Sequence, residues 1–138
     1  MVDFFGLPQT SSRGRVLVVD DEADVRKAVH LSLSKAGYQV IEADNGQAAV
    51  AVMNDGDNPL AVDVIICDIR MPHVNGVEAI SYFLREYPSR PIIVLTGFPD
   101  FELAVSLLKR GVADYIVKPV EREKLAAAVD SAMRLSRV

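Results

Sequence analysis

The sequence predicts an α/β domain built on a five-stranded parallel sheet, and three observations lead to this expectation. The chain has 138 residues, about the length of one domain, and 50% of them are hydrophobic. Five short apolar runs rich in β-branched residues alternate with longer amphipathic stretches. Three of these runs are almost unbroken in apolar residues, which is typical of strands covered on both faces, as in a parallel sheet.

The five apolar runs are the expected strands, at residues 16–19, 38–41, 62–67, 92–95 and 115–117. The expected helices alternate with them, at residues 24–36, 44–53, 77–87, 101–110 and 121–135. Gly37 and Pro88 end the first and third helices, while Asp44 and Asp100 cap the second and fourth. Residues 54–59 are expected to form an unusually long turn.

This alternation predicts right-handed crossovers between parallel strands, and five strands suit the flavodoxin-like, doubly wound order 2-1-3-4-5. In that arrangement a crevice opens where strands 1 and 3 diverge, and ligands bind there. Residues 1–14 show no periodicity and are expected to be a flexible leader. The folded domain is expected to cover residues 15–138.

Charge and cysteine content exclude several classes of function. Nineteen acidic and fifteen basic residues give a net charge of −4, so direct binding to nucleic acid or to an anionic membrane is not expected. One cysteine, Cys67, and two histidines can form neither an internal disulfide nor a closed zinc site. The chain shows no signal peptide and no apolar run of about 18 residues, so we expect a cytoplasmic protein.

Polar residues follow four of the expected strands at the point where each strand ends. They are Asp20, Asp21 and Glu22 after the first strand, Asp68 after the third, Thr96 and Gly97 after the fourth, and Lys118 after the fifth. Taken singly, each has a simpler explanation, such as capping the next helix. Together they are expected to meet in one crevice, because the carboxyl ends of parallel strands lie at the same edge of a sheet.

Gathered there, these groups suit phosphoryl transfer. Two carboxylates about 4 Å apart repel each other by on the order of 4 kcal/mol at an effective dielectric of 20, and one lysine cannot offset three acids. A divalent cation such as Mg²⁺ can, since it prefers oxygen ligands. Asp68 is the expected nucleophile, Lys118 a fixed cation, and the Thr96 hydroxyl and Gly97 N–H donors to the transferred oxygens.

These segments resemble the receiver domain of two-component response regulators over about residues 15–136. The matching segments are Val16-Leu-Val-Val-Asp-Asp-Glu22, Asp63-Val-Ile-Ile-Cys-Asp-Ile-Arg-Met-Pro72 followed by Asn75-Gly76, Ile93-Val-Leu-Thr-Gly97, and Gly111-Val-Ala-Asp-Tyr-Ile-Val-Lys-Pro119. The strand order 2-1-3-4-5 is itself a feature of this family, so it comes with the resemblance and is not independent support for it.

The resemblance implies a role for each site residue. Asp68 is the implied phosphoacceptor for a sensor histidine kinase or a phosphotransfer protein. Asp21, Asp68 and the backbone carbonyl of Arg70 are the implied ligands of Mg²⁺, or of Mn²⁺, with Asp20 acting mainly through water. Lys118 pairs with Asp68 and then with the phosphoryl group. The chain catalyses only its own phosphorylation and dephosphorylation, and in that sense is not an enzyme.

The resemblance also implies how the signal leaves the site. Thr96 and Tyr115 are the implied switch pair, which alters the surface formed by residues 101–110, 115–117 and 121–135. That surface would act on a downstream protein or on an output domain of the same protein, and a phosphorylation-linked homodimer is compatible with it. The peptide bond before Pro119 is expected to be cis.

Two crevice residues have no role implied by the family. Arg70 lies two residues after Asp68, and Phe98 two after Thr96. By charge or bulk they are expected to slow the attack of water on the acyl phosphate.

Three alternatives are weighed against this interpretation. A flavin carrier needs a phosphate-binding loop where Asp20, Asp21 and Glu22 would repel the phosphate. An aspartate-nucleophile phosphatase needs a second acid at the position of Arg70. A non-phosphorylated pseudo-receiver would keep the fold only as a protein docking module.

Overall fold

The computed structural model describes residues 13–70 and 76–136. Within these residues one five-stranded sheet has the order β2-β1-β3-β4-β5, and every neighbouring pair is parallel. The strands are β1 (Arg15–Val19), β2 (Gln39–Ala43), β3 (Val62–Cys67), β4 (Ile92–Thr96) and β5 (Asp114–Val117). The predicted flavodoxin-like arrangement is therefore confirmed.

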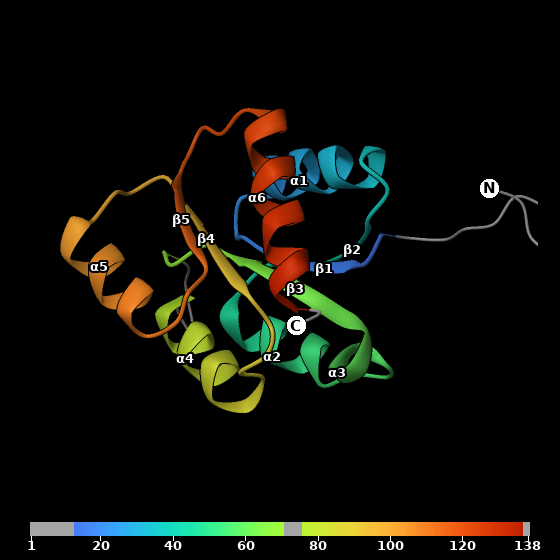
Figure 1. Ribbon diagram of the computed structural model, residues 1–138, viewed down its shortest axis with the longest axis horizontal. Helices are drawn as coiled ribbons and strands as arrows, with labels where there is room; N and C mark the ends of the chain where they lie inside the picture. The colour runs from blue at the N-terminus through green and yellow to red at the C-terminus, as the bar shows by residue number, and fades with distance from the viewer. Residues whose placement is uncertain (1–12, 71–75, 137–138) are drawn as a thin grey trace, which may run out of the picture.

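Helices cover both faces of the sheet (Figure 1). They are α1 (Ala23–Lys35), α2 (Gly46–Met53), α3 (Asn58–Ala61), α4 (Gly76–Glu86), α5 (Phe101–Lys109) and α6 (Arg122–Ser136). Helices α1 and α6 pack side by side against one face, and α2 and α4 pack together against the other. None of the described helices is both long and apolar enough to span a membrane.

The central strands β1, β3 and β4 are largely apolar because their two faces are buried in two different cores. Val16 and Val18 pack in the core that includes residues of α1 and α6. Leu17 and Val19 point the other way, into the core that includes residues of α2 and α4. Since side chains alternate along a strand, a strand buried on both sides needs apolar residues at every position.

Two local predictions are wrong. Helix α2 is capped by Asn45, whose side chain accepts a hydrogen bond from the N–H of Ala48 at 2.8 Å, and not by the predicted Asp44. The turn predicted over residues 54–59 is shorter, because α3 begins at Asn58, with Pro59 in its first turn, where a missing N–H costs little. The predicted cap of α5 is confirmed, since Asp100 accepts a hydrogen bond from Leu103 N–H at 3.0 Å.

The start of the described chain is tied to the domain. The N–H of Arg13 donates to the carbonyl of Gly37 at 2.9 Å, and its guanidinium pairs with Asp130 at 3.0 Å. The same guanidinium lies 4.9 Å from the centroid of the Tyr38 ring. Residues 1–12 of the predicted leader lie outside the described residues, so the leader and the domain boundary at residue 15 stay predictions.

Candidate functional site

The carboxyl ends of β1 and β3 bring two buried acids together. Val19 and Cys67 are register partners in neighbouring strands, so the residues that follow them, Asp20 and Asp68, are neighbours in space. The N–H of Asp68 donates to the carbonyl of Val19 at 2.9 Å. Only 2% of Asp20 and 3% of Asp68 is exposed. Positions 48 apart in the sequence thus form one site, as the alternation of strands and helices predicts.

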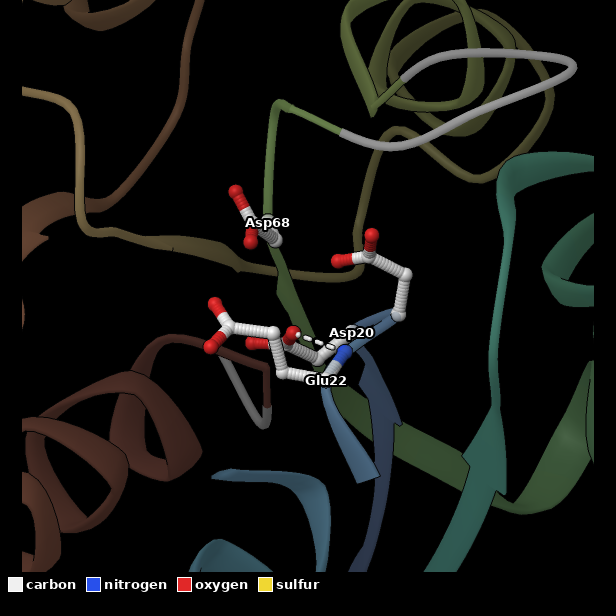
Figure 2. Close-up of side chains that lie close together, drawn as sticks. Asp20, Glu22 and Asp68 are labelled. Atoms are coloured by element: carbon white, nitrogen blue, oxygen red, sulfur yellow. Dashed lines mark hydrogen bonds between the residues drawn. The ribbon is translucent and has the colours of Figure 1, made fainter. Parts of the chain in front are cut away.

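Two further acids complete a cluster at this edge. Oxygen atoms from the carboxylates of Asp20, Asp21, Glu22 and Asp68 all lie within 4.8 Å of one another. Figure 2 shows the side chains of Asp20, Glu22 and Asp68 gathered at the end of the sheet. Asp21 and Glu22 are exposed while the other two acids are buried. This all-oxygen donor set, half buried and half open, fits a hard divalent cation that keeps several waters.

Lys118 is the only lysine or arginine paired with these acids in the described part of the chain. Its ammonium lies 2.7 Å from Asp20 Oδ2, 3.0 Å from Asp68 Oδ2 and 3.3 Å from Glu22 Oε1. Burial acts to lower the pKa of Lys118, but its hydrogen bonds to Asp20 and Asp68 outweigh burial and raise that pKa above its usual value. Lys118 therefore keeps its charge at neutral pH.

The buried Asp20 has a raised pKa although it pairs with Lys118. Burial raises the pKa of Asp20, although Lys118 and the N–H of Glu22 act to lower it, and the neighbouring charge of Asp68 raises it further. The raised pKa means that the ionised form of Asp20 lacks sufficient stabilisation in the folded chain. A bound cation would supply that stabilisation.

Backbone donors orient both buried acids. The N–H of Arg70 donates to Asp68 Oδ1 at 3.0 Å, while Asp68 Oδ2 accepts from Lys118. The N–H of Glu22 donates to Asp20 Oδ1 at 2.9 Å, the dashed line in Figure 2. Each carboxylate is thus held by one N–H and one ammonium.

The fourth and fifth strands contribute as predicted by their positions. Thr96 ends β4, is fully buried, and accepts a hydrogen bond from the N–H of Phe98 at 3.2 Å through its hydroxyl. Gly97 lies beside Lys118, because a Cβ at this position would be 3.9 Å from Lys118 Cδ. The peptide bond between Lys118 and Pro119 is cis, which confirms that expectation.

Tyr115 is less exposed than an ordinary strand tyrosine with a solvated hydroxyl. Its ring packs against the core shared with α2 and α4. Its hydroxyl oxygen is buried and has no hydrogen-bond partner among the described residues. The side chain therefore has an unsatisfied polar group that a rearrangement would relieve, and its role with Thr96 as a switch pair stays a prediction.

Arg70 and Phe98 touch each other across the ends of β3 and β4. The guanidinium carbon of Arg70 lies 4.5 Å from the centroid of the Phe98 ring, within the range of a cation–π contact. The sequence places the two residues beside the crevice, but it does not reveal that they form a pair. This contact joins the loop after Asp68 to the loop after Thr96.

Two further residues belong to the site although the sequence assigns no role to either of them. Glu22, which is expected in the crevice with Asp20 and Asp21, contacts Lys118. Gly76 packs against the backbone after β3, where a Cβ would lie 1.9 Å from the carbonyl oxygen of Asp68. A side chain at Gly76 would displace the residue that carries the predicted nucleophile.

Comparison with known proteins finds relatives across almost the whole domain. The model of the response regulator receiver domain family matches residues 16–130. The chemotaxis protein CheY of Thermotoga maritima is 35% identical over 117 residues, which are 84% of this chain and 94% of CheY. The transcriptional regulatory protein FixJ of Bradyrhizobium diazoefficiens is 32% identical over 124 residues, which are 90% of this chain.

Solved structures give the same result. A response regulator receiver domain protein from Clostridium thermocellum matches with a TM-score of 0.83 and 27% identity, over 90% of this chain and 97% of that chain. The receiver domain of NtrX from Brucella abortus matches with a TM-score of 0.78 and 29% identity, over 86% of this chain and 98% of that one. The chain spans 58% of FixJ and 25% of the Escherichia coli regulatory protein AtoC, so it matches one part of these longer proteins.

Proposed function

The chain belongs to the response regulator receiver domain family, and from this premise we propose that Asp68 accepts a phosphoryl group from the histidine of a sensor kinase or a phosphotransfer protein. The observation that supports the proposal most strongly is the placement of Asp68. It is buried, it is held by Arg70 N–H and Lys118, and it lies within 4.8 Å of three other acids. A structural aspartate gains nothing from such crowding, whereas a phosphoryl site needs it to bind a cation.

The transfer requires one bond to form and one to break. A carboxylate oxygen of Asp68 attacks the phosphorus as the bond from phosphorus to the donor's imidazole nitrogen breaks, and the electron pair stays on that nitrogen. Lys118 stands 3.0 Å from Asp68 and is placed to follow the charge onto the phosphoryl oxygens. The Thr96 hydroxyl and the Gly97 N–H are the proposed donors to the same oxygens.

The acidic cluster suits Mg²⁺, with Mn²⁺ as an alternative. Asp21, Asp68 and the backbone carbonyl of Arg70 are the proposed direct ligands, and Asp20 acts through water. A cation held by these residues would supply charge neutralisation to the transferred group. Asp20 supports this assignment, because burial and, to a smaller extent, the charge of Asp68 raise its pKa although Lys118 acts to lower it.

The proposed output surface lies on α5, β5 and α6. Once the Thr96 hydroxyl turns to the phosphoryl group, Tyr115 can rearrange and alter this surface. Phe101 and Val117 are exposed there by 83% and 42%, which is apolar area available to a partner. The partner is a downstream protein, an output domain of the same protein, or a second copy of the chain, in the cytoplasm where the kinase acts.

Labelling by a small phosphodonor tests the proposal. The chain is incubated with acetyl phosphate and Mg²⁺, and the mass of the intact protein is measured. We expect the wild type to gain one phosphoryl group, Asp68→Asn to gain none, and a chelator to prevent labelling. Asp24→Asn, which removes an acid of α1 outside the cluster, should be labelled like the wild type. A wild type that folds but is never labelled would favour the pseudo-receiver docking module instead.

A further inference from the structure

We infer that Arg26 of α1 is a positioning residue for the metal-binding acids, because its guanidinium fixes the peptide group that joins Asp20 to Asp21. The inference rests on the proposed function of the cluster, and it adds a residue that the motifs do not identify. Arg26 lies in the second turn of α1 and touches none of the clustered carboxylates, so its effect must pass through the backbone.

The guanidinium of Arg26 joins two strand ends. Its Nη1 donates to the backbone carbonyl of Asp20 at 2.8 Å, just after β1. Its Nε donates to Glu42 Oε1 at 2.8 Å, on the neighbouring strand β2. The side chain is only 17% exposed, so it is held in one place by packing as well as by hydrogen bonds.

The two backbone hydrogen bonds of Asp20 fix the direction of the chain through the site. The N–H of Asp20 donates to the carbonyl of Ala43 at 3.1 Å, and the Asp20 carbonyl accepts from Arg26. A peptide group is planar, so fixing the Asp20 carbonyl also fixes the N–H and the Cα of Asp21. The Cα of the exposed Asp21 is thereby held in place, although no ion pair or side-chain hydrogen bond of Asp21 is found in the described part of the chain.

Glu42 holds Arg26 in this position and offsets its charge. The two oxygens of Glu42 are divided between Arg26 and His30, whose Nδ1 lies 2.5 Å from Oε2. Burial acts to raise the pKa of Glu42, but the hydrogen bonds from His30 and Arg26 lower it below its usual value. Glu42 is therefore ionised at neutral pH. Arg26 therefore holds the backbone of the site in place, while Lys118 offsets the charge of the acids.

Arg15 provides a matched control at the opposite edge of the sheet. Its side chain is 16% exposed, and it also links β1 to β2, since Arg15 Nε donates to Gln39 Oε1 at 2.9 Å. Its Nη1 donates to Asp57 Oδ1 at 2.8 Å. The two arginines thus resemble each other in burial and in pairing, but only Arg26 binds the backbone of the acidic site.

Binding of Mg²⁺ itself tests the inference without any phosphorylation. The dissociation constant of the full chain for MgCl₂ is measured from amide chemical shifts at constant ionic strength. Arg26→Met should weaken Mg²⁺ binding about tenfold, the lower end of the loss when an outer-shell partner is removed. Arg15→Met should have a dissociation constant for Mg²⁺ within about twofold of that of the wild type, although it should lose about as much thermal stability as Arg26→Met. Glu42→Gln, which weakens the hold on Arg26, should fall between them.

Two results would overturn the inference: Arg26→Met binding Mg²⁺ as tightly as the wild type, or Arg15→Met weakening it equally. If Arg26→Met does not fold, Arg26→Lys decides, because it keeps the charge but loses the forked pair of donors. Unchanged Mg²⁺ binding in Arg26→Lys then counts against the inference. If the wild type binds no Mg²⁺, the proposed function is overturned as well. If the wild type binds Mg²⁺ and is labelled, the results with the Arg26 variants test the role of Arg26 alone.

Discussion

Charge is balanced differently at the amino edge of the sheet, where the strands begin, and at the carboxyl edge, where they end. At the amino edge the guanidinium of Arg15 pairs with one acid, Asp57, and its other hydrogen bonds are to the neutral side chains of Gln39 and Asn58. At the carboxyl edge Lys118 faces three acids at 3.3 Å or less. At the amino edge the charge of Arg15 is matched by one acid. At the carboxyl edge the acids outnumber the single lysine, and two of them are buried.

This difference separates a structural network from a functional one. Balanced pairs such as that of Arg15 and Asp57 hold the ends of strands and need nothing else. Unbalanced acids weaken the folded state unless a ligand compensates them, so their presence indicates a site that is completed by binding. Burial raises the pKa of Asp20 at the carboxyl edge, while the hydrogen bond from Arg15 lowers that of Asp57 at the amino edge.

Removing the cation from each edge should give the largest contrast. Lys118→Met leaves Asp20 and Asp68 buried without a counter-charge, so we expect the free energy of unfolding to fall by about 3 kcal/mol. Arg15→Met should lose about 1 kcal/mol. Urea denaturation measures both. Added Mg²⁺ should restore part of the loss in Lys118→Met and none in Arg15→Met, and equal losses in the two variants would remove the contrast.

A smaller effect is expected from crowding the backbone beside Asp68. Gly76→Ala places a methyl group 1.9 Å from the Asp68 carbonyl oxygen, which belongs to the backbone and cannot rotate away. We expect a loss of about 2 kcal/mol in the free energy of unfolding and slower labelling by acetyl phosphate. Denaturation and a labelling time course check this prediction. Labelling at the wild-type rate would mean that Asp68 tolerates displacement.

The contact between Arg70 and Phe98 should lengthen the lifetime of the acyl phosphate by a few-fold. Arg70→Ala and Phe98→Ala should each speed the loss of the phosphoryl group about threefold, since a cation–π contact is worth roughly 0.5–1 kcal/mol. The double variant should be little faster than either one, because the two side chains act as a pair. Decay followed by intact mass gives these rates.

Another arginine stacked on an aromatic ring controls for nonspecific effects on that lifetime. The guanidinium carbon of Arg85 lies 5.6 Å from the centroid of the Tyr82 ring, and both residues belong to α4, away from Asp68. Arg85→Ala should leave the decay unchanged. Additive effects of Arg70→Ala and Phe98→Ala would contradict the paired action.

The smallest expected effect is an opposite pH dependence at the two edges. The raised pKa of Asp20 means that the folded chain holds this proton more tightly, so its contribution to stability falls as pH rises from the usual value of 3.8 through the folded pKa. The lowered pKa of Asp57 has the reverse sign, and its contribution is lost as pH falls below 3.8.

Urea denaturation between about pH 3 and pH 6 measures these contributions. Asp20→Asn should become more stable relative to the wild type as pH rises, and Asp57→Asn less stable. If the stability of both variants relative to the wild type changed in the same direction with pH, the opposite pKa shifts of Asp20 and Asp57 would be contradicted.

The sequence predicts the fold and the meeting of the site residues for one physical reason. Strands buried on both faces are apolar throughout, so the first polar residue after each run marks the edge of the sheet. Asp20, Asp68, Thr96 and Lys118 are found in this way. The pattern needs no knowledge of side-chain contacts, and so it succeeds where the backbone alone decides the position.

The sequence does not predict features that depend on how far individual side chains reach. Asn45 and Asp44 are adjacent and both can cap a helix, so composition cannot choose between them. The bond from Arg26 to the Asp20 carbonyl and the stacking of Arg70 on Phe98 depend on rotamers and on neighbouring loops. Gly76 is important because the backbone of Asp68 and Ile69 occupies the space that a side chain would need, which only the three-dimensional structure reveals.

Locating the phosphoryl group chemically is the most direct test of this account. The chain is labelled with acetyl phosphate and Mg²⁺, the acyl phosphate is reduced with borohydride, and the modified residue is identified by tandem mass spectrometry. We expect reduction at Asp68 alone. Reduction at Asp20, Asp21 or Glu22, or the same yield without Mg²⁺, would contradict it.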